Sequence, residues 1–200
     1  QMVQYANPDV EAMKQAAWRT AKPLKEAALN AANKLNVTSG SMKGMPVSTL
    51  NANLYDLEKK VEGNVPLEKY LQGMRKRIVG KAREFNPSGT RIDANVLANM
   101  RDQVKNEISA LEGNERVSKT ALQKYAIDAE NAIDDAIETA GGTGKWAQWR
   151  KVYGGGMREI ERVNAGQQLA EASKGSAKGF TKAADTAMEE NRLTPQDRDA

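Results

Sequence analysis

The sequence predicts an all-α fold, an elongated multi-helix bundle of about six or seven helices without a sheet. Apolar residues recur at spacings of three and four in every long segment, and no segment sustains the alternation of a half-buried strand. Aromatic residues make up only 5% of the 200 residues, whereas alanine is very frequent. A core built from alanine and aliphatic side chains suits helices that approach one another closely.

The first predicted helix begins at Pro8 and keeps its apolar residues on one face as far as Leu35. Pro23 lies inside this pattern. Because an interior proline removes a backbone donor and clashes with the preceding turn, it predicts either a kink near Thr20 or two helices in sequence. Trp18 lies beside the apolar face and is expected to be an aromatic residue of the core or of its boundary.

The next two predicted helices follow a loop at residues 36–46, which contains glycines, serines and a proline. Ser48 is suited to cap a helix that ends at Gly63. Pro66 begins a further helix almost at once, and this helix runs to Phe85. A connection this short predicts that the two helices are antiparallel neighbours or form a sharp corner.

Two more helices are predicted between residues 93 and 141. Asp93 is suited to cap the first, whose apolar residues keep the strict a/d spacing of a narrow seam. Such a seam predicts near-parallel packing against partner helices. Ser118 is suited to cap the second, in which small residues allow close approach up to the glycine-rich turn at 141–144.

We predict that residues 144–169 form a long helix at the centre of the core. Two of the three tryptophans of the chain, Trp146 and Trp149, lie about one turn apart there, and aromatic side chains carry the largest burial area. Three consecutive glycines at 154–156 interrupt the segment. Because glycine is unfavourable inside a helix, they indicate either a close-packing notch or bend, or a full break.

The domain organisation is predicted as one helical bundle over residues 1–172, with a candidate sub-boundary at 36–47. Residues 173–200 are expected to form a weak helix and a polar tail. Both ends look like cuts, so we expect the chain to be a fragment of a longer polypeptide. No apolar run approaches the roughly 18 residues that a transmembrane helix needs.

The residue types offer little chemistry. The chain contains no cysteine and no histidine, which removes disulfides, thiolates, the usual zinc ligands and the commonest general base. Residues 141–145 depart from a phosphate-binding loop because Thr139 and Trp146 occupy positions where that pattern needs glycine and serine or threonine. Five carboxylates at 128–138 are expected to form a solvated face that pairs with basic neighbours. We therefore expect no catalytic residue, no metal site and no cofactor.

Basic side chains along the helix that ends at Phe85 form the candidate binding site. The net charge of +4 is too small by itself to indicate a nucleic-acid partner, so the distribution of charge decides. Cations along one helix face can contact successive phosphates, and a set without aromatic residues for stacking predicts contact that ignores base sequence. The alternative is a face that is merely solvated or paired with acidic neighbours. The candidate residues are Lys69, Arg75, Lys76, Arg77, Lys81 and Arg83.

Several short pieces occur in a characteristic order. They are residues 17–24 (AWRTAKPL) leading to 27–29, residues 36–38 (NVT) before a leucine stripe, Ile92 and Asp93 with Leu97 and Met100-Arg101, the alanine-rich acidic helix ending at Gly141, and residues 149–153 (WRKVY) with Ile160 and Glu161. This order resembles the repeated helical regions of large tailed-bacteriophage structural proteins, the internal virion proteins that are ejected with the genome or associate with the tail. The resemblance covers roughly residues 10–188.

The resemblance implies a non-catalytic assembly segment of a virion protein, located in the phage particle and in the host cytoplasm during assembly. Its expected partners are copies of itself or other virion proteins, with no small-molecule substrate. The basic helix face adds DNA as a non-specific partner. Two alternatives stay open. One is a region associated with a cell-wall-degrading phage enzyme such as a lytic transglycosylase, and the other is a generic helical interaction module.

Overall fold

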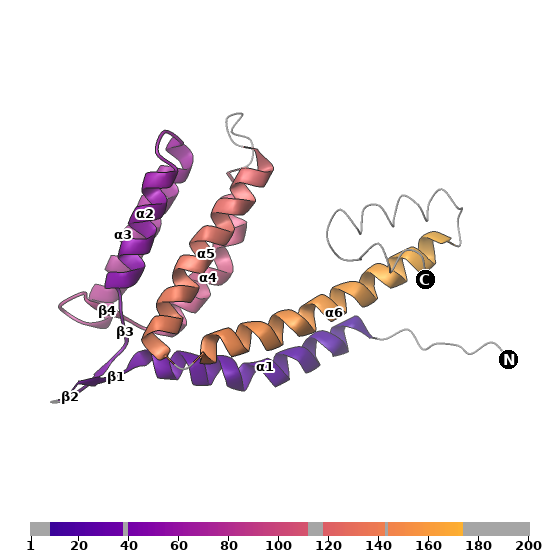
Figure 1. The fold of residues 1–200 in the computed structure, drawn as a ribbon, viewed down its shortest axis with the longest axis horizontal. Helices are drawn as coiled ribbons and strands as arrows, with labels where there is room; N and C mark the ends of the chain where they lie inside the picture. The colour runs from indigo at the N-terminus through magenta and orange to yellow at the C-terminus, as the bar shows by residue number, and fades with distance from the viewer. Residues whose placement is uncertain (1–8, 38–39, 112–117, 143, 174–200) are drawn as a thin grey trace. The chain divides into compact units, whose positions relative to one another are not determined.

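The computed structural model describes residues 9–37, 40–111, 118–142 and 144–173. Within these residues the elements follow in the order α1 (Val10–Asn33), β1 (Lys34–Val37), β2 (Gly40–Lys43), β3 (Met45–Pro46), α2 (Ser48–Lys60), α3 (Val65–Phe85), β4 (Arg91–Ile92), α4 (Ala94–Ser109), α5 (Lys119–Gly141) and α6 (Lys145–Ser173) (Figure 1). The predicted all-α class is confirmed, since helices account for most of the described residues. The weak helix predicted after residue 173 lies outside them.

The predicted absence of any sheet is wrong in detail, because four short strands form two antiparallel pairs. β1 pairs with β2 in a hairpin that begins with Lys34 opposite Lys43. β3 pairs with β4, so that Met45 lies opposite Ile92, and both side chains are fully buried. Gly44 adopts a φ of 90°, a conformation that glycine accommodates without strain. The second pair therefore joins the segment before α2 to the segment before α4 across a buried contact.

The chain divides into two compact units, and the division falls inside helices α1 and α6. We call Leu24–Ala147 the bundle unit, and Gln1–Pro23 with Gln148–Ala200 the paired-helix unit. The candidate sub-boundary at residues 36–47 lies within the bundle unit. The predicted single bundle over residues 1–172 stays a prediction.

The core of the bundle unit is formed by the apolar faces of its helices. In Figure 1, α2 lies beside α3 and α4 lies beside α5, and α2 also contacts α5. The seam residues predicted from helical spacing are largely buried. The buried positions of α2 to α5 include Leu50, Leu54, Leu57, Leu67, Leu71, Met74, Ile78, Ala82, Leu97, Val104, Ile108, Leu122, Ala126, Ala129, Ile133 and Ala136.

Helix caps in the bundle unit follow the sequence in two of the three predicted cases. Asp93 Oδ1 accepts from the Asn95 amide at 2.7 Å, and Ser118 Oγ accepts from the Ala121 amide at 3.2 Å. The third case is wrong, because α2 begins at Ser48 itself and Val47 occupies the cap position without a side-chain bond. The Val47 amide instead donates to the Thr90 carbonyl at 3.1 Å, so the neighbouring strand pair fixes this helix start.

The paired-helix unit contains the first part of α1 and most of α6, which run antiparallel (Figure 1). Trp149 stacks on Tyr153 with ring centroids 5.9 Å apart, and Trp18 meets the edge of Tyr153 at 6.0 Å. A Cβ added at Gly156 would lie 3.1 Å from the Cβ of Ala17, so a close-packing notch is confirmed at this glycine. The alternative of a full break is wrong, because α6 is helical through all three glycines.

Helix α1 is continuous through Pro23, so the alternative of two helices in sequence is wrong. The proline leaves the helix one backbone donor short, but the residues on both sides of it stay helical. Both tryptophans of the predicted central helix are buried, Trp146 at 2% and Trp149 at 4% exposure. Within the described residues, no helix combines the length and apolar character needed to cross a membrane.

Candidate nucleic-acid interface

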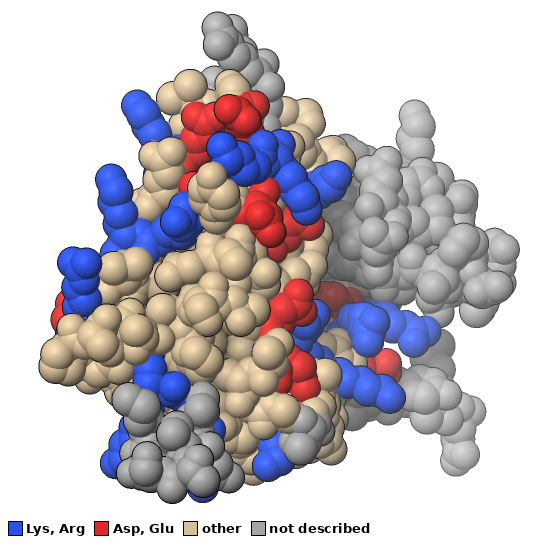
Figure 2. All heavy atoms as spheres, turned by 60° about the vertical axis from the view of Figure 1, so that its left-hand side comes forward, with Lys and Arg blue, Asp and Glu red and all other residues tan. Residues whose placement is uncertain are grey.

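All six predicted binding residues lie on α3, in the bundle unit. Asn64 caps this helix by accepting from the Leu67 amide at 3.3 Å, and Pro66 occupies its first turn. The apolar face of α3 is buried against the unit, which turns the basic side chains toward solvent. Figure 2 shows Lys and Arg side chains along the left-hand edge of the view.

Arg75 is held by helix α2. Its Nη1 donates to both carboxylate oxygens of Glu58, at 3.0 and 2.9 Å, and its guanidinium carbon lies 5.3 Å from the ring centroid of Tyr55. The cation therefore gains an ion pair and a contact with an aromatic ring. Both interactions fix the orientation of Arg75, and Glu58 compensates part of its charge.

Arg77 belongs to a second cross-helix cluster, with Glu107 of α4. The guanidinium grips the carboxylate with two bonds, Nη2 to Oε2 at 2.9 Å and Nη1 to Oε1 at 3.2 Å. Tyr70 Oη donates to the same Oε2 at 2.8 Å. The hydrogen bond from Arg77 lowers the pKa of Glu107, and burial together with the neighbouring carboxylate raises the pKa of Tyr70. Arg77 thus serves a structural contact between α3 and α4.

Lys81 forms an exposed pair with Glu84 on the same helix, with Nζ 2.7 Å from Oε2. Pairs of this kind contribute about 0.2–1 kcal/mol, and a phosphate can displace the carboxylate at little cost. Three of the six predicted residues therefore have acidic partners. Two of those partners, Glu58 and Glu107, come from other helices.

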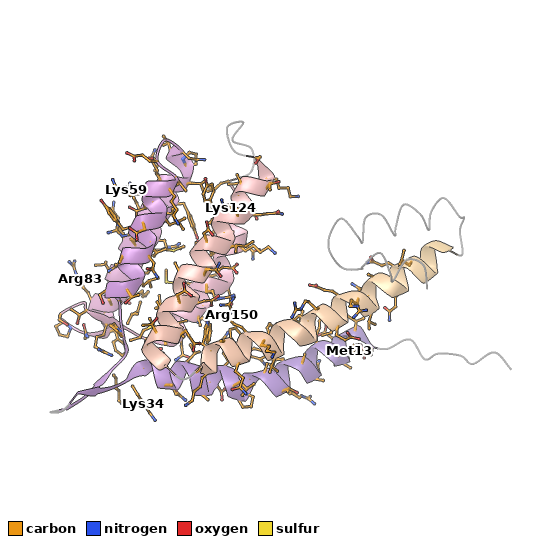
Figure 3. The ribbon with its side chains drawn as sticks, viewed as in Figure 1. Met13, Lys34, Lys59, Arg83, Lys124 and Arg150 are labelled. Atoms are coloured by element: carbon orange, nitrogen blue, oxygen red, sulfur yellow. The ribbon has the colours of Figure 1, made fainter. Side chains whose placement is uncertain are left out.

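Lys69, Lys76 and Arg83 differ from the other three, and we call them the open cations. Each is exposed, and none has an ion-pair partner among the residues that the structure describes. They are spaced seven residues apart, so they lie on nearly the same side of α3, about 10 Å from one to the next along its axis. The Arg83 side chain points outward near the end of the helix (Figure 3). A row of uncompensated cations at this spacing is suited to an extended polyanion.

A groove opens on the same side of α3, toward α2. Its volume is about 440 Å³. No acidic residue contributes to its lining, which consists of Asn51, Gln72, Arg75, Lys76, Val79, Gly80 and Arg83. Two of the open cations therefore stand at the groove, together with the α2-bound Arg75. Sequence reasoning missed Asn51 and Gln72, because they carry no charge and lie on different helices.

Asp134 contradicts the prediction that the acidic side chains of α5 form a solvated face. Its carboxylate is only 1% exposed. It accepts from Arg101 Nε at 2.6 Å, Arg101 Nη2 at 3.2 Å and Trp146 Nε1 at 2.7 Å. Burial without those donors would be unfavourable, so Asp134 belongs to the interior of the unit.

The other acidic residues of α5 do not gather into a metal site. Asp128 and Asp135 line a pocket of about 230 Å³ together with Asp56 and Lys60. Within the described ranges, no group of three or more carboxylates is arranged to hold a metal ion.

The chain matches no protein-family model, no curated protein and no solved structure.

Proposed function

We propose that the chain is a non-catalytic helical assembly segment of a tailed-bacteriophage virion protein, and that the exposed side of α3 contacts DNA without reading its sequence. The protein would reside in the phage particle after assembly in the host cytoplasm. Its partners would be copies of itself or other virion proteins.

The proposed DNA contact depends on one observation, the row of open cations on α3. Lys69, Lys76 and Arg83 are exposed and have no acidic partner among the described residues, so contact with phosphates would cost no existing ion pair. The paired cations Arg75 and Arg77 are better explained by their contacts with α2 and α4. The proposed DNA contact therefore involves fewer residues than the six predicted from the sequence.

The proposed role in virion assembly rests on the sequence resemblance and not on the apolar seams of the helices. The a/d seams that predicted partner helices are buried inside the bundle unit, where α2 to α5 satisfy one another. Large apolar side chains that stay exposed in this unit include Tyr55, Val65 and Ile127. Single exposed apolar residues are common on protein surfaces, so they supplement the resemblance without replacing it.

The proposed DNA contact is tested by fluorescence anisotropy with a short DNA duplex over a range of salt concentrations. Replacing Lys69, Lys76 and Arg83 with Gln should weaken binding of all sequences alike and reduce the log–log salt slope by about one for each phosphate that the variant no longer neutralises. The matched control replaces three exposed lysines of α4 and α5, Lys105, Lys119 and Lys124, and removes the same charge. Equal losses of affinity in the two triple variants would show that net charge, not the α3 row, governs binding.

The proposed presence of the protein in the phage particle has a separate test, mass spectrometry of purified particles from the source phage or prophage. Peptides of this chain should be present in particles at a fixed ratio to other structural proteins. Peptides found in infected cells but missing from particles would refute a virion role while leaving the DNA result intact.

A further inference from the structure

We propose that the groove between α2 and α3 seats a phosphate group of a nucleic-acid strand, which makes it a defined anchor within a row of general electrostatic contacts. The proposal rests on the proposed DNA contact of α3 and specifies where one phosphate binds. It concerns Asn51, Gln72, Arg75, Lys76 and Arg83, with Gly80 between the cations.

The shape of the groove depends on Gly80. A Cβ added at this glycine would meet no heavy atom within 4 Å, so any side chain there would project into open space. Lys76 precedes Gly80 by four residues and Arg83 follows it by three, so both cations are its neighbours on the helix surface. The missing side chain thus leaves a hollow directly between two uncompensated positive charges.

Arg75 is the cation at the groove that is held in place before any ligand arrives. Arg75 is fixed by Glu58 and Tyr55, and its side chain is 33% exposed. Lys76 and Arg83 have no acidic partner among the described residues. Gly89, in the turn after α3, leaves room for the Arg83 stem, because an added Cβ there would lie 2.9 Å from Arg83 Cγ. A preorganised cation such as Arg75 loses little conformational entropy on binding an anion.

Two buried polar atoms without a partner belong to residues that line the groove. They are Asn51 Oδ1 and Arg75 Nε, which have no hydrogen-bond partner within the described residues. Buried polar atoms are normally satisfied, and each unsatisfied one costs about 1–3 kcal/mol. A phosphate only accepts hydrogen bonds, so it can serve as the acceptor for Arg75 Nε but not as a partner for Asn51 Oδ1. The Asn51 amide can rotate to offer its NH₂ in place of its oxygen.

A phosphate fits this combination better than a carboxylate. Its oxygens accept hydrogen bonds in several directions at once, which matches donors that arrive from α2 on one side and from α3 on the other. A volume of about 440 Å³ exceeds what an isolated phosphate needs, so it leaves room for the attached sugar. The groove therefore suits a phosphate within a strand.

The decisive variant is Gly80→Leu, with Gly73→Leu as its matched control. Gly73 lies on the same helix, seven residues earlier and therefore on nearly the same side, and a Cβ there also meets nothing within 4 Å. It does not line the groove. With a single-stranded oligothymidylate, Gly80→Leu should weaken binding about tenfold or more, and Gly73→Leu should change it less than about twofold. Circular dichroism verifies the fold, and Lys76→Gln replaces Gly80→Leu if the latter is misfolded.

The second arm uses sodium pyrophosphate and isothermal titration calorimetry. Pyrophosphate should bind the wild type and Gly73→Leu, should compete with the oligonucleotide, and should fail to bind Gly80→Leu. Wild-type affinity for the oligonucleotide in Gly80→Leu would overturn the anchor and leave the proposed DNA contact standing. Failure of the wild type to bind either the oligonucleotide or a duplex, with pyrophosphate still bound at the groove, would overturn the DNA contact and keep the phosphate site. Binding of none of these probes would overturn both.

Discussion

Trp146 Nε1 donates a hydrogen bond to Asp134 Oδ1 at 2.7 Å, and both side chains are buried. The same carboxylate accepts two bonds from Arg101 on α4, and Glu130 lies 3.6 Å from the same guanidinium. One buried anion thus ties together α4, α5 and the first turn of α6. The burial of Asp134 is tolerable only because donors from two other helices surround it.

Replacing Asp134 with Ala should destabilise the protein by about 3–5 kcal/mol, because it leaves the Arg101 guanidinium without its main partner and the Trp146 indole without an acceptor. Urea unfolding followed by circular dichroism measures the effect. The control Asp135→Ala removes an exposed carboxylate from the next position and should stay within about 0.5 kcal/mol of wild type. Equal midpoints for the two variants would contradict a structural role for the buried pair.

Replacing either buried tryptophan with Ala should cost about 3–5 kcal/mol, since each removes a large ring from a packed position. Trp18→Ala should cost less, because that side chain is 41% exposed. Thermal unfolding of the three variants ranks the effects. If Trp146→Ala and Trp149→Ala both unfold at the wild-type midpoint, these rings are not central to the packing.

Substituting Ala at Gly73 or Gly80 should stabilise the protein by about 0.5–1 kcal/mol each. Both glycines lie within α3, where a Cβ meets no atom within 4 Å and alanine has the higher helix propensity. Gly44→Ala should have the opposite effect, because its φ is 90° and a Cβ there would clash with the Phe85 ring. Chemical denaturation distinguishes the signs, and a destabilised Gly80→Ala would contradict the open space at that position.

The pair between Arg77 and Glu107 predicts a specific dependence of stability on pH. The hydrogen bond from Arg77 lowers the pKa of Glu107 in the folded state, below its ordinary value of 4.5. The contribution to stability is therefore complete above the ordinary pKa and is lost as the pH falls through the folded-state pKa. Glu107→Gln should lose stability near neutral pH and show a smaller further loss on acidification. Parallel curves for wild type and variant below pH 4.5 would contradict this assignment.

Local rules in the sequence determined most of the helices. Apolar spacing placed Leu67, Met74 and Ile78 on the buried side of α3, and cap chemistry placed the starts of α4 and α5 at Asp93 and Ser118. These features depend on residues within one or two turns of each other, so a single sequence contains the information. The same rules put the basic residues of α3 on its solvent-facing side.

Tertiary structure alone decided which charges are paired and which are open. Arg75 meets Glu58 at a separation of 17 residues, Arg77 meets Glu107 at 30, and Arg101 meets Asp134 at 33. These partners come together only when the helices pack, and helical spacing along one segment contains no information about them. The short strand pairs likewise depend on contacts between distant segments.

The glycines show the same division between local and tertiary information. Propensity alone left the run at 154–156 open between a break and a notch, and the contact of Gly156 with Ala17 shows why its small size is needed. Gly80 carried no signal in the sequence. Its place in the lining of the groove, with Lys76 and Arg83, emerges only where α2 packs against α3, because a groove is a property of two surfaces.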